Sequence, residues 1–248
     1  MKMTLLEVVQ SVLSSMNSDN VNNVSDTIES SQVVDVAKDV YYELISYNDF
    51  PHLWKWQQLE AVGDVTRPNY LKIPEDVQRM EAFKYNITET GDTNETITEV
   101  TYLDPKDFIE KVHGRHTSES NVDIVTNENS VDMFIINDKA PDYWTSFDDE
   151  YIVTDSYNAS EDVTLNGSKS SAWCRVIPSW TSSNTFTPDF PADFFPVYLA
   201  EVKSACHLYI KQQLSQKDEQ KARRGLSHVR RKQRFDRGRI YNTYGRFS

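Results

Sequence analysis

The sequence contains few of the residues that form cross-links or sharp turns. Only two of its 248 residues are cysteine, and seven are glycine. Two cysteines cannot make a disulfide framework, and neither belongs to a Cys-x-x-Cys pair that could hold a metal. So little glycine, with no repeated period, argues against collagen-like rods and solenoids. We therefore interpret Cys174 and Cys206 as thiols that pack inside a folded protein.

Long hydrophobic runs are also missing. No apolar stretch approaches the length of a membrane span, and the N-terminus lacks the apolar block and cleavage site of a signal peptide. We therefore expect a protein that is made in the cytoplasm and has no membrane partner. Its residues are 38% hydrophobic and 12% aromatic, which is enough to fill a core in a chain of this length.

The short motifs of common catalytic sites are absent as well. The sequence contains no GxSxG, P-loop, GxGxxG or HExxH pattern. An enzyme would therefore depend on polar residues that converge in a pocket of the folded chain. We expect no catalytic residues and no cofactor, and we keep an enzyme site in the middle of the chain as an alternative.

Two polar stretches invite comparison with metal sites. The run His113–His116 holds two histidines, with Glu110 and Glu119 nearby. The glycine between these histidines does not set ligands on a rigid face, so a solvated helix end is the simpler interpretation. The acidic turn at 148–150 lacks the spaced oxygen ligands of a calcium loop, and we interpret it as a hairpin turn. We expect no metal site.

Helical periodicity occurs near both ends of the chain. Thr4 with Glu7 fits a capping box, and the apolar stripe behind it predicts a helix to about Met16. A second stripe predicts a helix over residues 26–48. A third stripe follows Pro191, with Asp193 and Pro196 at its start. Its apolar residues are Leu199, Val202, Cys206, Tyr209, Ile210 and Leu214.

Between these segments the apolar residues alternate with period two, which predicts β-strands. Residues 83–87 and 97–103 have the pattern of a hairpin. Asp104 and Pro105 predict the start of a short helix through Val112, because proline suits the first helical turn. Further strands are predicted at residues 121–125, 130–136, 150–155 and 173–177.

These elements predict an α+β fold with three parts. The helices at the two ends can bury their stripes only against one another. We therefore expect a helical bundle built from residues 1–50 and 191–220, with an inserted antiparallel β-rich domain at residues 51–190. Residues 221–248 are expected to form an extended basic C-terminal tail.

Charge divides the chain unevenly. The formal net charge is −12, but residues 217–248 hold 11 basic and 3 acidic residues, so residues 1–216 carry −20. A solubilising end is the simplest interpretation of the basic tail. Its interleaved arginines and aromatic rings favour instead a docking segment, although the same mixture suits stacking on single-stranded nucleic acid. The candidate partner-binding residues are Arg223, Arg224, Arg230, Arg231, Lys232, Arg234, Arg237, Arg239, Tyr241, Tyr244, Arg246 and Phe247.

Three stretches resemble structural proteins of short-tailed bacteriophages. The first is Pro141–Val153, which is followed by Asp155-Ser156-Tyr157. The second is Gln32–Leu44, and the third runs from Phe190 to Arg224. The layout of these stretches resembles the head-to-tail adaptor family, also called tail tubular protein A or gatekeeper proteins. None of the shared motifs is catalytic.

The resemblance implies a virion protein of the phage neck that forms a ring, a dodecamer in this family. It implies a helical domain against the portal protein, a β-rich domain toward the tail or nozzle protein, and a C-terminal extension between portal subunits. Double-stranded DNA would pass through the lumen during genome ejection, where an acidic wall limits sticking. The alternative from another class is a nucleic-acid-binding protein that uses the basic aromatic tail.

Overall fold

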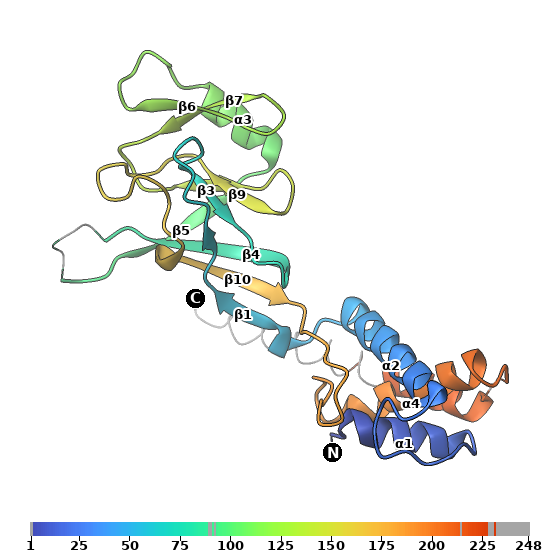
Figure 1. Ribbon diagram of the computed structural model, residues 1–248. Helices are drawn as coiled ribbons and strands as arrows, with labels where there is room; N and C mark the ends of the chain where they lie inside the picture. The colour runs from blue at the N-terminus through green and yellow to red at the C-terminus, as the bar shows by residue number, and fades with distance from the viewer. Residues whose placement is uncertain (1, 89–90, 92, 214, 228–230, 232–248) are drawn as a thin grey trace, which may run out of the picture. The chain divides into compact units, whose positions relative to one another are not determined.

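Figure 1 shows a computed structural model of the chain. The structure describes residues 2–88, 91, 93–213, 215–227 and 231. The chain divides into two compact units. We call the first, which combines the residues up to Phe50 with the chain from Pro178 onward, the helical unit. The second, Pro51–Ile177, is the β unit. No described helix is long and apolar enough to cross a membrane.

Local capping signals set the first helix of the helical unit. α1 (Leu5–Ser15) starts at Thr4, whose side chain and that of Glu7 each accept a hydrogen bond from the other's backbone N–H. Met16 is the C-cap. The predicted capping box and helix end are therefore confirmed. The inward face of α1 is fully apolar, with Leu5, Val8, Val9, Val12 and Leu13 buried.

The second helix begins slightly later than expected. α2 (Ile28–Tyr47) is capped by Thr27, which exchanges hydrogen bonds with Ser30, and it ends at Asn48 as predicted. Asp26 closes the preceding turn instead, because its carboxylate accepts the backbone N–H groups of Asn22 and Asn23. The side chains of Asp and Thr both cap helices well, so neighbouring candidates can compete for this position.

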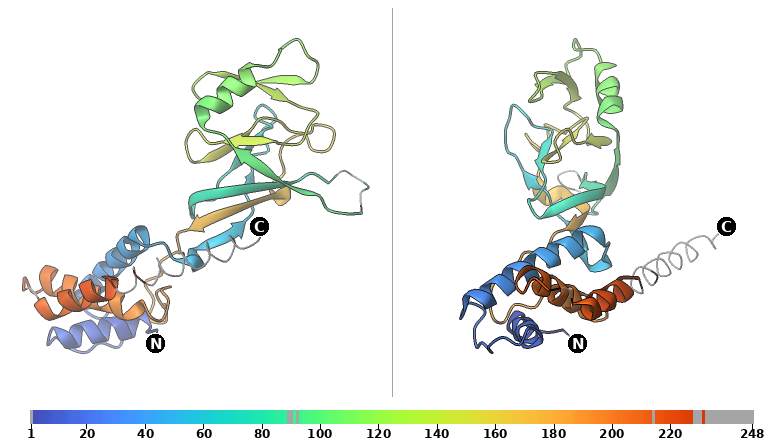
Figure 2. Two further views of the ribbon diagram at one scale, coloured as in Figure 1. Left: turned by 180° about the vertical axis from the view of Figure 1, so that it is seen from behind. Right: turned by 90° about the vertical axis from the view of Figure 1, so that its right-hand side faces the viewer.

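An aromatic cluster holds the helical unit together. α4 (Phe195–Tyr209) packs against α1 and α2, as the two views of Figure 2 also show. Tyr41 of α2 lies 5.1 Å, centroid to centroid, from Phe190, which lies 5.1 Å from Tyr198 of α4. The Tyr198 hydroxyl donates to the Ala37 carbonyl at 3.2 Å. The Tyr41–Phe190 pair is edge-to-face, with 69° between the ring planes, and contacts of this kind add to the stabilisation from burial alone.

The stripe predicted for the last helix is partly wrong. Tyr209 is 71% exposed and Leu199 is only half-buried, while Ile210 is the C-cap. Leu214 lies outside the described residues. The buried face of α4 is therefore rotated about the helix axis relative to the predicted stripe. The bulky rings of Phe195 and Tyr198 pack into the core and determine which face turns inward. The buried side chains of α4 are Phe195, Val197, Tyr198, Ala200, Val202 and Cys206.

The β unit is built on a mixed sheet of eight strands in the order β1-β10-β4-β5-β8-β9-β3-β2. The two end strands, β1 and β2, are separated only by Gln58 and Leu59. So short a link brings both ends of the sheet together, and the sheet therefore curls around its core (Figure 1). The strands are β1 (Trp54–Gln57), β2 (Glu60–Ala61), β3 (Tyr70–Lys72), β4 (Val77–Asn86), β5 (Ile97–Tyr102), β8 (Tyr143–Thr145), β9 (Tyr151–Thr154) and β10 (Ser170–Val176).

A helix and a small hairpin complete the β unit. α3 (Pro105–His113) is capped by Asp104 with proline in its first turn, as predicted. It packs beside the antiparallel pair β6 (Val122–Thr126) and β7 (Asp132–Ile136). The predicted hairpin of β4 and β5 is confirmed by their antiparallel register. Short 3-10 turns, η1 (Pro51–Leu53) and η2 (Gly167–Lys169), precede β1 and β10.

The expected fold, a helical bundle with an inserted antiparallel β-rich domain, is wrong. The α+β class label agrees, but the described chain is organised around a large, curled and mixed sheet rather than a bundle. β5 and β8 pair in parallel, with Thr101 opposite Tyr143. This is possible because α3 and the β6–β7 hairpin supply the long crossover that parallel neighbours need. Period-two patterns predict strands, but they do not reveal how distant strands pair.

Candidate functional site

The chain after α4 forms a further helix at residues 216–227, which we call the C-terminal helix. It starts at Ser215, whose carbonyl accepts the Glu219 N–H at 3.0 Å and whose hydroxyl donates to Asp218 at 2.6 Å. Two acids in the first turn also suit the positive end of the helix dipole. The sequence does contain this helix-start signal, a serine followed by two acids. We did not predict the helix because the basic composition of the segment suggested an extended tail.

The C-terminal helix packs through small residues. Ala222 is 1% exposed. A Cβ added to Gly225, three residues later on the same face, would lie only 2.6 Å from Cγ2 of Val197 on α4. The absence of a side chain at Gly225 therefore permits close contact with α4. Residues up to Gly225 belong to the folded helical unit, beyond the boundary that the charge pattern suggested.

Two of the predicted docking residues, Arg223 and Arg224, lie on the exposed side of the C-terminal helix, away from Ala222 and Gly225. Arg223 is 76% exposed and its guanidinium donates to the Glu219 carboxylate at 2.5 Å. Arg224 and Arg231 are exposed. Nine of the predicted residues lie outside the described residues: Arg230, Lys232, Arg234, Arg237, Arg239, Tyr241, Tyr244, Arg246 and Phe247.

An acidic group sits beside this helix. Burial raises the pKa of the Glu201 carboxyl on α4, and the charge of Glu43 on α2 raises this pKa further. Arg223 acts in the opposite direction and lowers it. Arg223 therefore already interacts with the acidic residues Glu201 and Glu219 of its own unit. Of the two neighbouring arginines, Arg224 is the better candidate for pairing with an acid of another protein.

The histidine stretch has a structural arrangement. His113 ends α3, its Nε2 lies 2.7 Å from the Asp132 carbonyl oxygen, and its ring lies 5.4 Å from the Phe134 ring. His116 is exposed. Within the described residues, no group of three or more His, Cys, Asp or Glu side chains could hold a metal ion.

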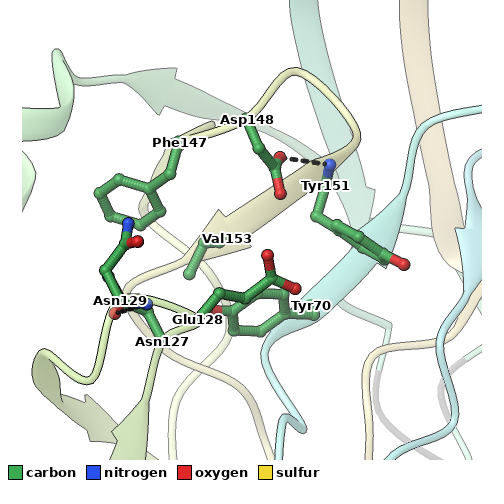
Figure 3. Close-up of a pocket in the computed structure, with 8 residues that line it drawn as sticks. All are labelled: Tyr70, Asn127, Glu128, Asn129, Phe147, Asp148, Tyr151 and Val153. Atoms are coloured by element: carbon green, nitrogen blue, oxygen red, sulfur yellow. Dashed lines mark hydrogen bonds between the residues drawn. The ribbon is translucent and has the colours of Figure 1, made fainter.

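The acidic turn borders a small cavity of about 40 Å³. Figure 3 shows Tyr70, Phe147, Tyr151 and Val153 around it, with Asp148 at its edge. The Asp148 carboxylate accepts the Tyr151 N–H at 3.0 Å, as a hairpin turn requires. A ligand pocket usually encloses roughly 300–1,000 Å³, so this cavity is too small for a substrate.

Two larger hollows are open and mainly polar. One, of about 730 Å³, lies beside β6 and includes Asp123 and Tyr157. The Tyr157 hydroxyl donates to Asp123 at 2.6 Å, so these two side chains satisfy each other. The second, of about 470 Å³, lies beside α1 and is lined by Gln10, Asn20 and serines. Neither hollow gathers the nucleophile, base and anion-binding groups of a catalytic site.

Sequence reasoning missed a nearly buried ion pair of the β unit. The side chain of Arg115 is 14% exposed and forms a 2.6 Å ion pair with Asp155, which is 4% exposed. Arg115 also donates to the carbonyl oxygen of Phe134 at 2.8 Å. The sequence placed Arg115 in a polar run after α3, where nothing signalled burial.

Comparison with known proteins does not provide a family for this chain, because no protein-family model and no curated protein matches it. The resemblance to head-to-tail adaptors therefore stays an expectation based on the three stretches described above. These stretches lie in α2, in the hairpin of β8 and β9, and in α4 with the C-terminal helix.

Proposed function

We propose that this chain is a non-enzymatic component of a phage neck, which forms a ring between the portal and the tail and lets DNA pass. One observation carries the proposal. The C-terminal helix is fixed to the helical unit by Ala222 and Gly225, while Arg223 and Arg224 face outward on the same helix. The chain thus continues from a packed anchor directly into its most basic and aromatic sequence.

This arrangement suits docking to a separate acidic protein. Arginine forks pair with carboxylates in bidentate geometry, and aromatic rings between them can fill pockets. The portal protein is the proposed partner of the candidate residues at 223–247. A packed anchor reduces the conformational freedom lost on docking, since the first residues of the segment are already ordered.

The rest of the chain is compatible with the other neck contacts. Residues 1–216 carry a formal charge of −20, and a like-charged lumen would let double-stranded DNA slide without sticking. In the proposed ring, the β unit would contact the tail or nozzle protein. The finished protein would then be located in the virion neck after synthesis in the host cytoplasm.

Deletion of residues 232–248 tests the docking step. The cut leaves Ala222 and Gly225 in place, so the variant should keep its melting temperature. It should fail to join portal-containing heads of the phage that encodes the chain. Lys106→Ala removes an 81% exposed cation from the β unit and serves as the control, which should join heads normally. Normal joining by the deletion variant would contradict the proposal.

The nucleic-acid-binding alternative is favoured by one feature, the interleaving of Tyr241 and Tyr244 with Arg239 and Arg246. Phosphate contacts lose affinity steeply with rising salt, in proportion to the charges that they engage. A titration of the full-length protein with double- and single-stranded DNA from about 50 to 200 mM salt separates the two functions. Tight, salt-sensitive binding that disappears on deleting residues 232–248 would favour the alternative.

A further inference from the structure

One edge of β6 has no strand beside it. β6 pairs with β7, and within the described residues it pairs with no other strand. The Asn137 N–H donates to the Asn121 carbonyl and the Asn127 N–H donates to the Val131 carbonyl, both at 2.9 Å. Because hydrogen-bonded positions alternate along an antiparallel pair, the odd-numbered residues of β6 point their backbone groups toward β7. The even-numbered residues point theirs away from it.

The outward backbone groups of Ile124 and Thr126 are unpaired. No described residue forms a backbone hydrogen bond with the N–H or the carbonyl oxygen of either one. The N–H of Val122, which also points outward, donates to the Glu119 carbonyl at 3.3 Å. An unpaired strand edge is a template for another strand. β6 therefore offers donors and acceptors at two alternate residues to a further strand.

An open hollow of about 730 Å³ lies beside this strand. Residues 123–127 line it together with the loop at 65–68 and with Tyr157. Its volume is within the range of roughly 300–1,000 Å³ that binding sites usually enclose, so an extended segment has room to approach β6. We call this hollow, together with the unpaired edge of β6, the β6 groove.

The β6 groove is acidic. Asp123 and Arg67 are the charged residues among its described lining residues. Side chains that hydrogen-bond to the lining side chains add three acids and, within the described part of the chain, no base. The local balance is therefore four acids against one base. The three added acids are Asp64, which accepts the Thr66 hydroxyl, Glu128, which accepts Arg67, and Asp132, which accepts the Thr126 hydroxyl.

The basic side chains at the groove are already paired. Arg67 lies 3.0 Å from the Glu128 carboxylate. Lys139, whose backbone N–H donates to the Tyr157 carbonyl, forms an ion pair with Asp142. A basic partner therefore meets acids without displacing a cation that lines the groove, and opposite charge attracts it and directs its approach.

The two faces of β6 differ in chemistry. Val125 is buried, and Asp123 lies on the same face, where its Oδ2 accepts the Tyr157 hydroxyl at 2.6 Å. Ile124, which is 57% exposed, and Thr126 lie on the opposite face. An added strand would place alternate residues beside Asp123 and the residues between them beside Ile124. Lysine or arginine suits the first set, and β-branched residues suit the second.

We infer that the β6 groove binds an extended basic segment of a partner protein, which adds to β6 as a further strand. Main-chain hydrogen bonds to Ile124 and Thr126 give affinity, and the alternation of basic with β-branched residues gives specificity. A second copy of this chain fits less well, because its own β6 would bring the same acids into contact. Under the proposed function the partner is the tail or nozzle protein, and only this assignment rests on that proposal.

A short fluorescent peptide that alternates lysine with valine tests the groove, with anisotropy of its complex with the full-length protein as the readout. The peptide should bind, and rising salt should weaken the binding. A peptide with glutamate in place of lysine should not bind. The lysine peptide with methylated backbone nitrogens keeps its charge but loses the N–H groups that pair with β6, so it should bind about tenfold more weakly.

Variants of the protein test the same contact from the other side. Ile124→Pro removes an outward N–H and keeps the bonds to β7, since an edge strand tolerates proline whose nitrogen faces solvent. It should bind the lysine peptide about tenfold more weakly, whereas Ile124→Thr keeps the N–H and should bind like wild type. Asp123→Asn should weaken binding and its salt dependence, with Glu99→Gln on β5 as the unaffected control. The melting temperature verifies that each variant is folded.

The inference is overturned if the lysine peptide does not bind at low salt, or if its methylated form or folded Ile124→Pro binds as tightly as the unmodified pair. Tighter peptide binding after deletion of residues 232–248 would assign the groove to the chain's own tail, and self-association that Ile124→Pro abolishes would assign it to a second copy. Either result also overturns the inference.

These results are distinguishable from failure of the neck proposal. If the lysine peptide does not bind but the 232–248 deletion variant fails to join heads, the groove inference fails and the neck proposal stands. If the deletion variant joins heads normally, the neck proposal fails and strand addition to β6 is unaffected.

Discussion

Arg115 and Asp155 form a nearly buried ion pair that joins the end of α3 to the strands β7, β8 and β9. The Arg115 Nη2 lies 2.6 Å from the Asp155 Oδ2. The other carboxylate oxygen accepts the backbone N–H groups of Asp142 and Tyr143 at 3.1 and 2.8 Å. Both charges are thus satisfied on several sides, which is the condition for tolerating a buried pair.

Removing one partner of this pair should strongly destabilise the β unit. Arg115→Ala leaves the Asp155 carboxylate buried without its cation, and we expect a loss of about 3–5 kcal/mol in the free energy of unfolding. Lys106→Ala breaks an exposed pair with Glu110, whose side chains are 81% and 69% exposed, and should cost only about 0–1 kcal/mol. Urea unfolding followed by tryptophan fluorescence measures both variants. Equal losses in the two variants would contradict this account of the buried pair.

Gly225→Ala should destabilise the helical unit even though alanine favours helices. The added Cβ would approach Val197 Cγ2 to 2.6 Å, and overpacking of this kind costs about 1–3 kcal/mol. That cost exceeds the gain of up to about 1 kcal/mol in helix propensity. Gln220→Ala, at an exposed position of the same helix, should be neutral or slightly stabilising. Thermal unfolding followed by circular dichroism compares the two.

A double substitution separates steric conflict from a general effect on the helix. Val197→Ala removes the atom that the new Cβ would meet, so the combined variant should be more stable than the two separate losses predict. Simple additivity of Gly225→Ala and Val197→Ala would indicate that the two side chains do not meet.

The sequence predicted the elements whose signals are local. Thr4 with Glu7, and Asp104 with Pro105, are neighbours in the chain, and each pair fixes a helix start without help from elsewhere. The face of α4 was predicted less well, because Tyr41 and Phe190 determine where its aromatic residues turn. The parallel pairing of β5 and β8 was not predicted, since it depends on a crossover of about forty residues.

The candidate site shows the same division between local and distant information. The density of arginine after Lys221 was visible in composition, but the fixation of the C-terminal helix was not, because the Gly225 contact with Val197 joins residues 28 positions apart. Likewise, the contact between the rings of Trp56 and Trp173 requires the register that pairs β1 with β10. The order of residues along the chain does not show which distant segments pair or in what register.

Glu201 should make the helical unit less stable as pH rises. Burial raises the pKa of this carboxyl above its ordinary value of 4.5, with Glu43 adding to the effect. Between 4.5 and the raised value, the folded state binds the proton more readily, so the free energy of unfolding falls as pH increases. Glu201→Gln should therefore raise the melting temperature at neutral pH. Glu99→Gln, at an exposed position on β5, is the control, and an equal rise in both variants would contradict the burial argument.

The two cysteines offer separate reports on the two units. Cys174 and Cys206 are both free and buried, which confirms the prediction that they are thiols packed inside the protein. Burial raises the pKa of Cys174 to about 11 and that of Cys206 to about 12, and only the thiolate reacts quickly. At pH 8 the native protein should therefore react with a thiol reagent far more slowly than a Tyr47→Cys variant, whose new thiol replaces a 72% exposed ring.

As urea is added, each thiol should begin to react with the reagent when its own unit unfolds. Cys206 belongs to the helical unit and Cys174 to the β unit. Single Cys→Ala variants assign the two reactions. Arg115→Ala should accelerate the reaction of Cys174 and leave that of Cys206 unchanged, whereas Gly225→Ala should do the reverse. Equal acceleration of both thiols by either substitution would show that the two units unfold together, because independent units transmit a local loss of stability only to their own thiol.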